Sequence, residues 1–174
     1  VAKASKHCFC PLAVGGGIKS IKDFRDLFES GADKCVINSI LYDSPDVVSE
    51  AVSSYGSQAI VASIDIKKNP SNGLISVYKD RGKTNTYLSL SEAIKYALSL
   101  KVGELLISSI DHDGSTLGYD HHILDTLKTS ISVPVVVNSG AIEPIHFKEG
   151  IDHPIVSAVA GSNVFYFSEL SYPN

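Results

Sequence analysis

The sequence predicts an α/β fold of the (β/α)8 barrel type that is incomplete, with about six of its eight βα units. Three observations predict it. Short apolar runs alternate with helical patterns along the chain, as they do in βα units. Residues 11–17 return in altered form as residues 134–140, and residues 35–39 return as residues 158–162, so the chain repeats such a unit. In both copies a turn of glycine or small polar residues joins the strand to the helix. An open, doubly wound sheet of six strands is the alternative, but it does not require paired turns.

The expected strands are the apolar runs at residues 9–14, 35–38, 59–66, 104–109, 133–138 and 156–160. Near-continuous apolar runs are typical of parallel strands that are buried on both faces. The expected helices are marked by their ends. The first covers about residues 20–30 and stops at Gly31, while Ser44 and Pro45 open the second, which Gly56 ends. A capping box at residues 89–92 opens the third, which reaches about residue 101, and the fourth follows residues 118–120.

Residues 67–88 interrupt this alternation. Turn residues punctuate a short stretch with period-two alternation, which predicts a β-hairpin inserted after the third strand. An insertion on the strand-to-helix side of a barrel lies over the catalytic face. The hairpin is therefore either a flap over that face or an insertion without a functional role.

Composition restricts the classes of protein. The chain has 174 residues, 44% of them hydrophobic, and a net charge of −4, which fits one domain over residues 1–174. No apolar run approaches the roughly 20 residues of a membrane helix, no signal peptide opens the chain and no basic stripe is present. We therefore expect a cytoplasmic protein that binds neither membrane nor nucleic acid. The three cysteines and six histidines lack ligand spacing, so we expect no metal and no cofactor. A complete barrel commonly has about 250 residues, so we expect that its first quarter is not part of this chain.

The turns at the strand ends predict anion binding. The glycines ending at Gly17 stand between a strand and a helix, where backbone N–H groups approach an anion closely. Asn38 and Ser39 follow the next strand. Matching small residues occur in the second copy at Ser139, Gly140, Gly161 and Ser162. Two such sites at opposite edges of one barrel mouth predict a substrate that carries two phosphates.

Carboxylates at two other strand ends are candidates for chemistry. Asp65 ends a strongly apolar run, where a buried carboxylate is costly unless it is used or paired. We interpret it as a proton-transferring group, and the alternative is a capping or ion-paired residue near Lys67 and Lys68. Asp111 and Asp113 follow the next strand, where they hydrogen-bond substrate hydroxyls or order the loop.

Two charged residues stand at the opposite, amino-terminal ends of their strands. Lys34 and Glu104 form part of a charged ring at the barrel floor if their side chains point inward. The alternative is two solvated charges at the rim.

Several sequence segments together resemble the HisF family, the cyclase subunit of imidazole glycerol phosphate synthase. They are Val14-Gly-Gly-Gly-Ile18, Gly31-Ala-Asp-Lys-Cys-Val-Ile-Asn-Ser39, the run from Gly56 to Asp65, the run from Gly103 to Gly114, and Gly118-Tyr-Asp120. The resemblance implies a (β/α)8 barrel that receives ammonia from a HisH-like glutaminase docked at its floor. It also implies that ammonia and a bisphosphorylated ribulosyl aminoimidazole intermediate yield imidazole glycerol phosphate in histidine biosynthesis, together with an aminoimidazole carboxamide ribotide.

The resemblance also implies roles for residues at matching positions. Asp65 resembles the catalytic general acid/base, and Ser108 stands near it where the family usually has threonine. Lys34 and Glu104 resemble members of an ammonia gate. One phosphate site corresponds to Gly17, Asn38 and Ser39, and the other to Asp113, Gly114, Gly140, Gly161 and Ser162, beside Ser139.

Departures from the family pattern leave two alternatives open. The family's second catalytic carboxylate lies on its first strand, which has no counterpart here, so the chain is expected to be defective in cyclisation unless another segment completes it. Asn138-Ser139 replaces the more usual serine-glycine pair. Gly161-Ser-Asn163 and Ser171-Tyr-Pro173 look closer to a HisF-like branch associated with glutamine-dependent amidation of surface-glycan sugars. The other alternative is a non-catalytic phosphate-binding scaffold.

Overall fold

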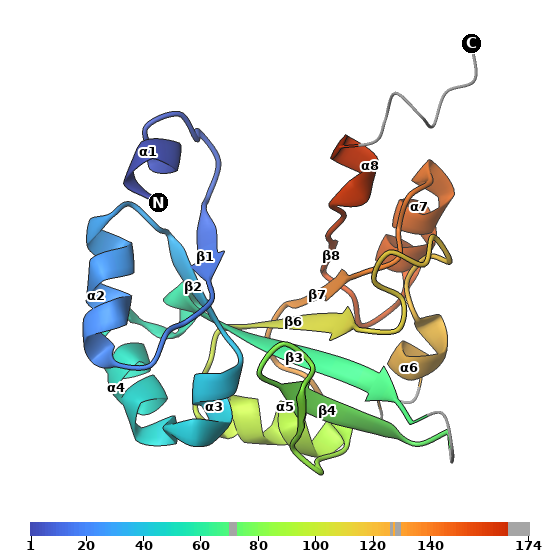
Figure 1. The fold of residues 1–174 in the computed structure, drawn as a ribbon, viewed down its shortest axis with the longest axis horizontal. Coiled ribbons are helices and arrows are strands. Elements are labelled where there is room, and N and C mark those ends of the chain that lie inside the picture. Colours follow the sequence, from blue (N-terminus) through green and yellow to red (C-terminus); the bar gives the residue numbers. More distant parts are fainter. Residues whose placement is uncertain (70–72, 126, 128–129, 167–174) are drawn as a thin grey trace.

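The computed structural model describes residues 1–69, 73–125, 127 and 130–166. Its central feature is a curved sheet in which the parallel strands follow one another in chain order: β1 (Ala13–Gly15), β2 (Lys34–Ile37), β3 (Ile60–Lys68), β6 (Glu104–Ser109), β7 (Val135–Asn138) and β8 (Ala158–Val159). A doubly wound sheet reverses its strand order at a switch point, and this sheet does not. β1 and β8 stand apart at the two edges of the sheet (Figure 1). The fold is therefore an incomplete (β/α)8 barrel, as the sequence predicts.

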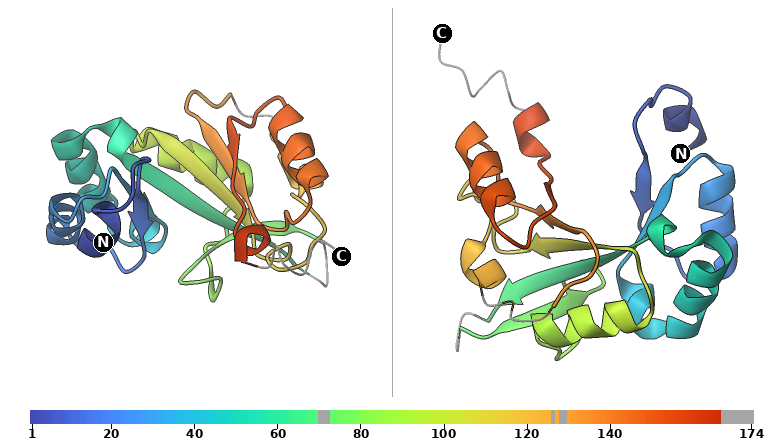
Figure 2. Two further views of the ribbon diagram at one scale, coloured as in Figure 1. Left: turned by 90° about the horizontal axis from the view of Figure 1, so that it is seen from above. Right: turned by 180° about the vertical axis from the view of Figure 1, so that it is seen from behind.

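Helices flank the sheet on its convex side. α2, α4, α5 and α7 lie along the outside of the curve (Figure 2). The helices are α1 (Ala2–Ser5), α2 (Ile21–Glu29), α3 (Ser39–Asp43), α4 (Pro45–Tyr55), α5 (Leu90–Ser99), α6 (His121–Asp125), α7 (Pro144–Asp152) and α8 (Asn163–Tyr166), with a 3-10 turn at Ser57–Ala59. Within the described ranges, none of these helices is long and apolar enough to cross a membrane.

Local sequence signals account for the helix ends. A capping box opens α5, in which the Ser89 hydroxyl accepts from the backbone N–H of Glu92 and the Glu92 carboxylate accepts from Ser89 in return. Pro45 occupies the first turn of α4, and Gly56 follows its last residue with a φ of 88°. These boundaries agree with the sequence prediction to within one or two residues.

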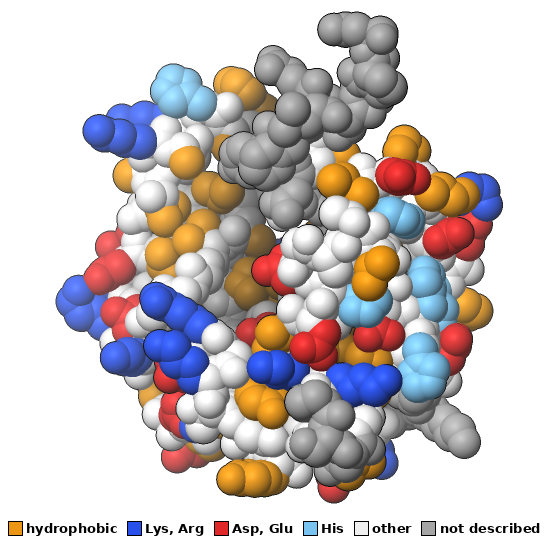
Figure 3. Space-filling model, turned by 45° about the vertical axis from the view of Figure 1, so that its right-hand side comes forward, with side chains coloured by type: hydrophobic (Ala, Val, Ile, Leu, Met, Phe, Trp, Pro, Cys, Tyr) orange, Lys and Arg blue, Asp and Glu red, His pale blue; other side chains and the backbone are white. Residues whose placement is uncertain are grey.

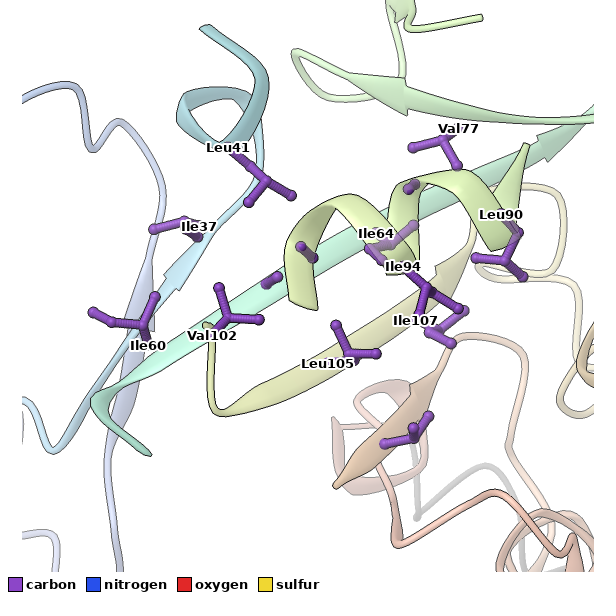
Figure 4. Close-up of a cluster of buried hydrophobic side chains, with 14 of the residues drawn as sticks. Ile37, Leu41, Ile60, Ile64, Val77, Leu90, Ile94, Val102, Leu105 and Ile107 are labelled. Atoms are coloured by element: carbon purple, nitrogen blue, oxygen red, sulfur yellow. The ribbon is translucent and has the colours of Figure 1, made fainter. Parts of the chain in front are cut away.

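Strand alternation separates two faces of the sheet. Cys35, Ile64 and Leu105 point to the convex face and are fully buried under the helices. Figure 4 shows part of this cluster, with side chains of β3 and β6 beside those of α5. Side chains at the intervening positions, such as Val36 and Leu106, are only half-buried. The expectation that the strands are buried on both faces is therefore wrong for the concave face, because the curved sheet does not close over it.

The predicted hairpin is present. β4 (Ile75–Lys79) runs antiparallel to β3, with Val77 opposite Ile66, and then pairs with β5 (Thr84–Asn85). The two edge strands are shorter than predicted. The strand expected at residues 9–14 begins only at Ala13, which pairs with Lys34, and Phe9 is fully exposed. The strand expected at residues 156–160 is limited to Ala158–Val159, since only these residues pair with β7.

Candidate active site

The candidate site lies at the carboxyl-terminal ends of the parallel strands, on the concave side of the sheet. This is the edge at which (β/α) barrels carry their catalytic residues. The molecule is hollowed on its open side (Figure 3). An open cavity of about 790 Å³ extends from the end of β1 to the ends of β2 and β3, and its lining includes Gly16, Gly17, Asn38, Ser39 and Asp65.

The first glycine turn is shaped for close approach of a ligand. Gly16 and Gly17 have φ values of +99° and +75°, and a Cβ atom on either would meet no atom within 4 Å, so their backbone faces open space. Gly15 has a different reason to be glycine, because a Cβ there would lie 2.5 Å from the carbonyl oxygen of Val36 on the neighbouring strand. The turn therefore combines tight strand packing with an exposed backbone at the cavity wall.

Asn38 and Ser39 continue this wall at the end of β2. The Asn38 amide donates from Nδ2 to the carbonyl oxygen of Ser63 at 3.1 Å, so part of its hydrogen-bonding capacity ties β2 to β3. The Ser39 hydroxyl accepts from the backbone N–H of Asp80, which belongs to the hairpin, at 3.0 Å. Both residues lie where the sequence places them, and both also hold the scaffold of the cavity together.

The second predicted anion site forms a separate, smaller pocket of about 20 Å³ at the ends of β6, β7 and β8. Its lining includes Asp113, Gly114, Ser139, Gly140, Gly161 and Ser162. Gly114 has a φ of +72° with open space at its Cβ position, whereas a Cβ on Gly140 would lie 2.2 Å from the Gly118 oxygen. By volume this pocket holds a water-sized group, so a phosphate there sits at its mouth. The structure thus brings each predicted set together, one toward each edge of the sheet.

Asp65 lies on the concave face of β3, in the wall of the larger cavity on the side toward the strands that carry the smaller pocket. Ser63, two residues earlier on the same face, donates from Oγ to Asp65 Oδ1 at 3.0 Å. Burial raises the pKa of the Asp65 carboxyl above its ordinary value, and the hydrogen bond from Ser63 offsets this only in part. A half-buried carboxyl with a raised pKa, facing a cavity, is typical of a group that transfers protons.

The ion pair considered as an alternative role of Asp65 is absent among the described residues. Its side chain forms no ion pair with the lysines that follow it. Lys67 extends over the ring of Tyr78, with Nζ 5.9 Å from the ring centroid, and the backbone N–H of Lys68 donates to Asp111 at 2.7 Å. Asp111 therefore orders the end of β3, which is the second of the two roles considered for it.

Ser108 lies directly across from Asp65 on the neighbouring strand β6. Its Oγ accepts from Asn138 Nδ2 at 3.3 Å, which links β6 to β7. Because Ser108, Asn138 and Asp65 share the concave face, a row of polar side chains crosses three adjacent strands beneath the cavity mouth.

The opposite end of the concave face carries one ion pair. Lys34 Nζ and Glu104 Oε2 are in contact, and their side chains are 33% and 18% exposed. The pair joins β2 and β6 across β3 at the amino-terminal ends of the strands. The two residues are thus paired and partly buried, and not separately solvated.

Sequence reasoning missed several residues at the cavity. Lys19, Asp43, Asp80 and Arg81 line it, the last two from the tip of the hairpin. For Asp80 and Arg81, the sequence offered one signal: the hairpin is inserted directly after β3. Among the residues described by the structure, no group of three or more His, Cys, Asp or Glu side chains is arranged to hold a metal ion.

Fold and site together define a (β/α)-barrel protein with polar and glycine-rich turns and a carboxyl of raised pKa at the carboxyl-terminal edge of its sheet. A family model described as "Histidine biosynthesis protein" matches residues 1–171, and the chain belongs to this family. Curated relatives named imidazole glycerol phosphate synthase subunit HisF support the more specific resemblance. The protein from Chloroherpeton thalassium is 39% identical over 171 residues, 98% of this chain and 67% of the relative. Those from Hydrogenobaculum sp. and Lachnoclostridium phytofermentans are 36% and 35% identical, with 98% of this chain matched to 68% and 66% of theirs.

The predicted relationship to HisF is therefore confirmed. The chain spans about two thirds of the length of the curated relatives that it matches. The closing segment 171–173, which favoured the glycan-amidation branch, lies outside the described residues.

Proposed function

We propose that this protein is the cyclase subunit of an imidazole glycerol phosphate synthase, in which ammonia reacts with a bisphosphorylated ribulosyl aminoimidazole intermediate. The observation that carries this proposal is the position of Asp65, whose carboxyl has a raised pKa and lines one of two glycine-turn pockets at the same edge of the sheet. Since the substrate belongs to amino-acid biosynthesis, a cytoplasmic location is part of the proposal.

The spacing of the two pockets supports a bisphosphate. One lies at the ends of β1 and β2 and the other at the ends of β6, β7 and β8, so a substrate anchored at both extends across β3. Backbone N–H groups and the hydroxyls of Ser39 and Ser162 supply donors for phosphate oxygens. The central part of such a substrate is then held over Asp65.

Asp65 is suited to both directions of proton transfer. Condensation of ammonia with the ribulosyl ketone expels water, so a proton must be given to the departing oxygen, and ring closure requires that protons be removed from nitrogen. A carboxyl whose pKa is raised above its ordinary value is more readily protonated, so it can serve as acid and then as base. Among the other described carboxylates at this cavity, Asp43 is paired with Lys79 and Asp80 lies at the exposed hairpin tip.

The far end of the concave face suits the arrival of ammonia. We place a HisH-like glutaminase at the amino-terminal ends of the strands, where the Lys34–Glu104 ion pair lies. Rearrangement of this pair opens a route along the half-buried face toward Asp65. The partner and the gate rest on the resemblance to HisF, and the ion pair is the feature of this chain that supports them.

The test is turnover of the ribulosyl intermediate with ammonium salts at high pH, where free ammonia replaces the glutaminase. We expect imidazole glycerol phosphate when a segment with the first-strand carboxylate completes the barrel, and a loss of about 10²- to 10⁴-fold in kcat for Asp65→Asn in that completed protein. Asp46→Asn is the matched control, because Asp46 is an exposed carboxylate in the first turn of α4.

Two results contradict the proposal. No product from the completed protein excludes this cyclase activity and favours glycan amidation. Equal rates for the parent and the Asp65→Asn variant remove Asp65 from the reaction. Normal turnover of the Asp46→Asn variant shows that the loss is specific to the position of the carboxyl.

A further inference from the structure

The hairpin tip is held over the larger cavity by contacts on two sides. The backbone N–H of Asp80 donates to Ser39 Oγ at 3.0 Å, and Lys79 pairs with Asp43 on the short helix that follows β2. On the other side, a Cβ on Gly82 would lie 3.0 Å from Ile110, the residue that follows β6. The tip therefore spans the end of β3, where the cavity opens.

The backbone of the tip has an uncommon conformation. Asp80 and Arg81 have φ values of +51° and +57°, a left-handed region that L residues other than glycine rarely occupy. Such conformations persist only where the surrounding structure enforces them, and they concentrate at functional sites. Here the hydrogen bond to Ser39 and the ion pair of Lys79 with Asp43 hold the turn, and the turn places Arg81 in the cavity lining.

Arg81 is the charged group of the tip that remains available. It lines the same cavity as Gly16, Gly17 and Ser39, and no described residue forms an ion pair with its guanidinium. An arginine that borders a glycine turn provides planar, bidentate donors for a phosphate oxygen pair. Lys19 is the other basic residue among those that line this cavity.

We propose that Arg81 binds the phosphate held at Gly16, Gly17 and Ser39, so that the β4–β5 hairpin forms one wall of a phosphate monoester site. This inference rests on the phosphate site of the proposed function and adds a substrate-binding residue to it. Ser39 couples the two parts: its oxygen accepts from Asp80, and its O–H, which makes only a long bond of 3.5 Å to Asn38 Oδ1, can rotate to donate to the phosphate. The phosphate and the hairpin tip therefore share one hydroxyl, and the guanidinium closes the site from the side of the hairpin.

The test measures inorganic phosphate binding by calorimetry and 31P NMR on the parent protein and three variants. Arg81→Gln removes the charge, Arg81→Lys keeps the charge without the planar fork, and Lys83→Gln is the matched control. Lys83 is an exposed cation on the same hairpin that does not line the cavity. We expect Arg81→Gln to weaken phosphate binding at one of two sites by roughly 10- to 100-fold, the range for a hydrogen-bonded charge pair. The phosphate affinity of Arg81→Lys is expected to lie between those of the parent and Arg81→Gln, and the affinity of Lys83→Gln is expected to stay within about 2-fold of the parent.

If Arg81→Gln and Lys83→Gln weaken phosphate binding equally, the inference is overturned, because the loss of affinity then comes from the change in net charge and not from a contact with Arg81. Absence of phosphate binding by the parent protein also overturns it. The proposed function fails independently: phosphate affinity that depends on Arg81, without turnover of the ribulosyl intermediate by the completed protein, supports the binding residue and contradicts the cyclase. Turnover that depends on Asp65, with unchanged phosphate binding and KM in Arg81→Gln, contradicts the binding residue alone.

Discussion

Replacement of Ser139 by glycine is expected to stabilise the protein. Ser139 follows β7 with a φ of +86° and is 7% exposed, so its Cβ is held in a conformation that disfavours side chains. Left-handed backbone costs a non-glycine residue about 1–2 kcal/mol, whereas glycine adds about 0.5–1 kcal/mol of conformational entropy to folding. Among the described residues its hydroxyl has no hydrogen-bond partner, so little else is lost. The net gain is about 0.5–1 kcal/mol, which raises Tm by roughly 1–4 °C in a chain of this size.

Urea unfolding followed by circular dichroism measures this gain, with Ser139→Ala as the matched control. Alanine removes the same hydroxyl but keeps the Cβ, so its free energy of unfolding is expected to stay at or below that of the parent. If Ser139→Gly and Ser139→Ala have the same stability, strain at this position is not the cause and the reasoning is refuted.

Three further predictions concern ionisable groups. Burial raises the pKa of the Asp65 carboxyl in the folded state. The protonated carboxyl therefore contributes fully to the free energy of unfolding below its unfolded pKa of about 3.9, and this contribution is lost as pH rises through its folded pKa. In urea titrations, the free energy of unfolding of Asp65→Asn is therefore expected to rise relative to that of the parent as pH goes from 4 to 8. The rise is about 1.4 kcal/mol for each unit by which the folded pKa exceeds the unfolded pKa. A difference in stability between variant and parent that stays constant over this range contradicts the assignment. A double-mutant cycle with Lys34→Met and Glu104→Gln is expected to give a coupling energy of about 1 kcal/mol that falls with added salt, whereas additive effects mean that the ion pair contributes nothing. Burial raises the pKa of the Cys35 thiol to about 11, so iodoacetamide at pH 8 is expected to modify the other two cysteines and spare Cys35 until the protein is unfolded, as peptide mass analysis will show.

Much of the fold follows from local sequence signals. The strand over residues 104–109 has the bounds that its apolar run predicts, and α5 begins where the capping box of Ser89 and Glu92 places it. Edge strands were predicted less well. Their apolar runs continue beyond the residues that pair with a neighbouring strand, as at Phe9. Strand length depends on this pairing, which forms only in the folded chain. The extent of the domain over residues 1–174 stays a prediction.

Site residues could be predicted from the sequence where their position depends on a single strand. Alternation along β3 places Asp65 on the concave face, and the glycine turns lie at strand ends by their place in the sequence. Tertiary contacts decide the rest. The bond from Asn38 to Ser63 joins two strands, and the position of Arg81 depends on a hairpin whose tip is fixed by distant residues. The left-handed conformation of Ser139 had one sequence signal, the departure from the more usual glycine.

The central claim is that the Asp65 carboxyl lies between two phosphate sites at one mouth. Carboxyl 13C NMR titration measures this most directly, with the Asp65 signal assigned from its loss in Asp65→Asn. The account predicts a pKa above the ordinary aspartate value of about 3.9 in the free protein, and a further rise when phosphate occupies the sites, because nearby negative charge disfavours ionisation. A pKa at or below the ordinary value that does not change with phosphate would contradict it.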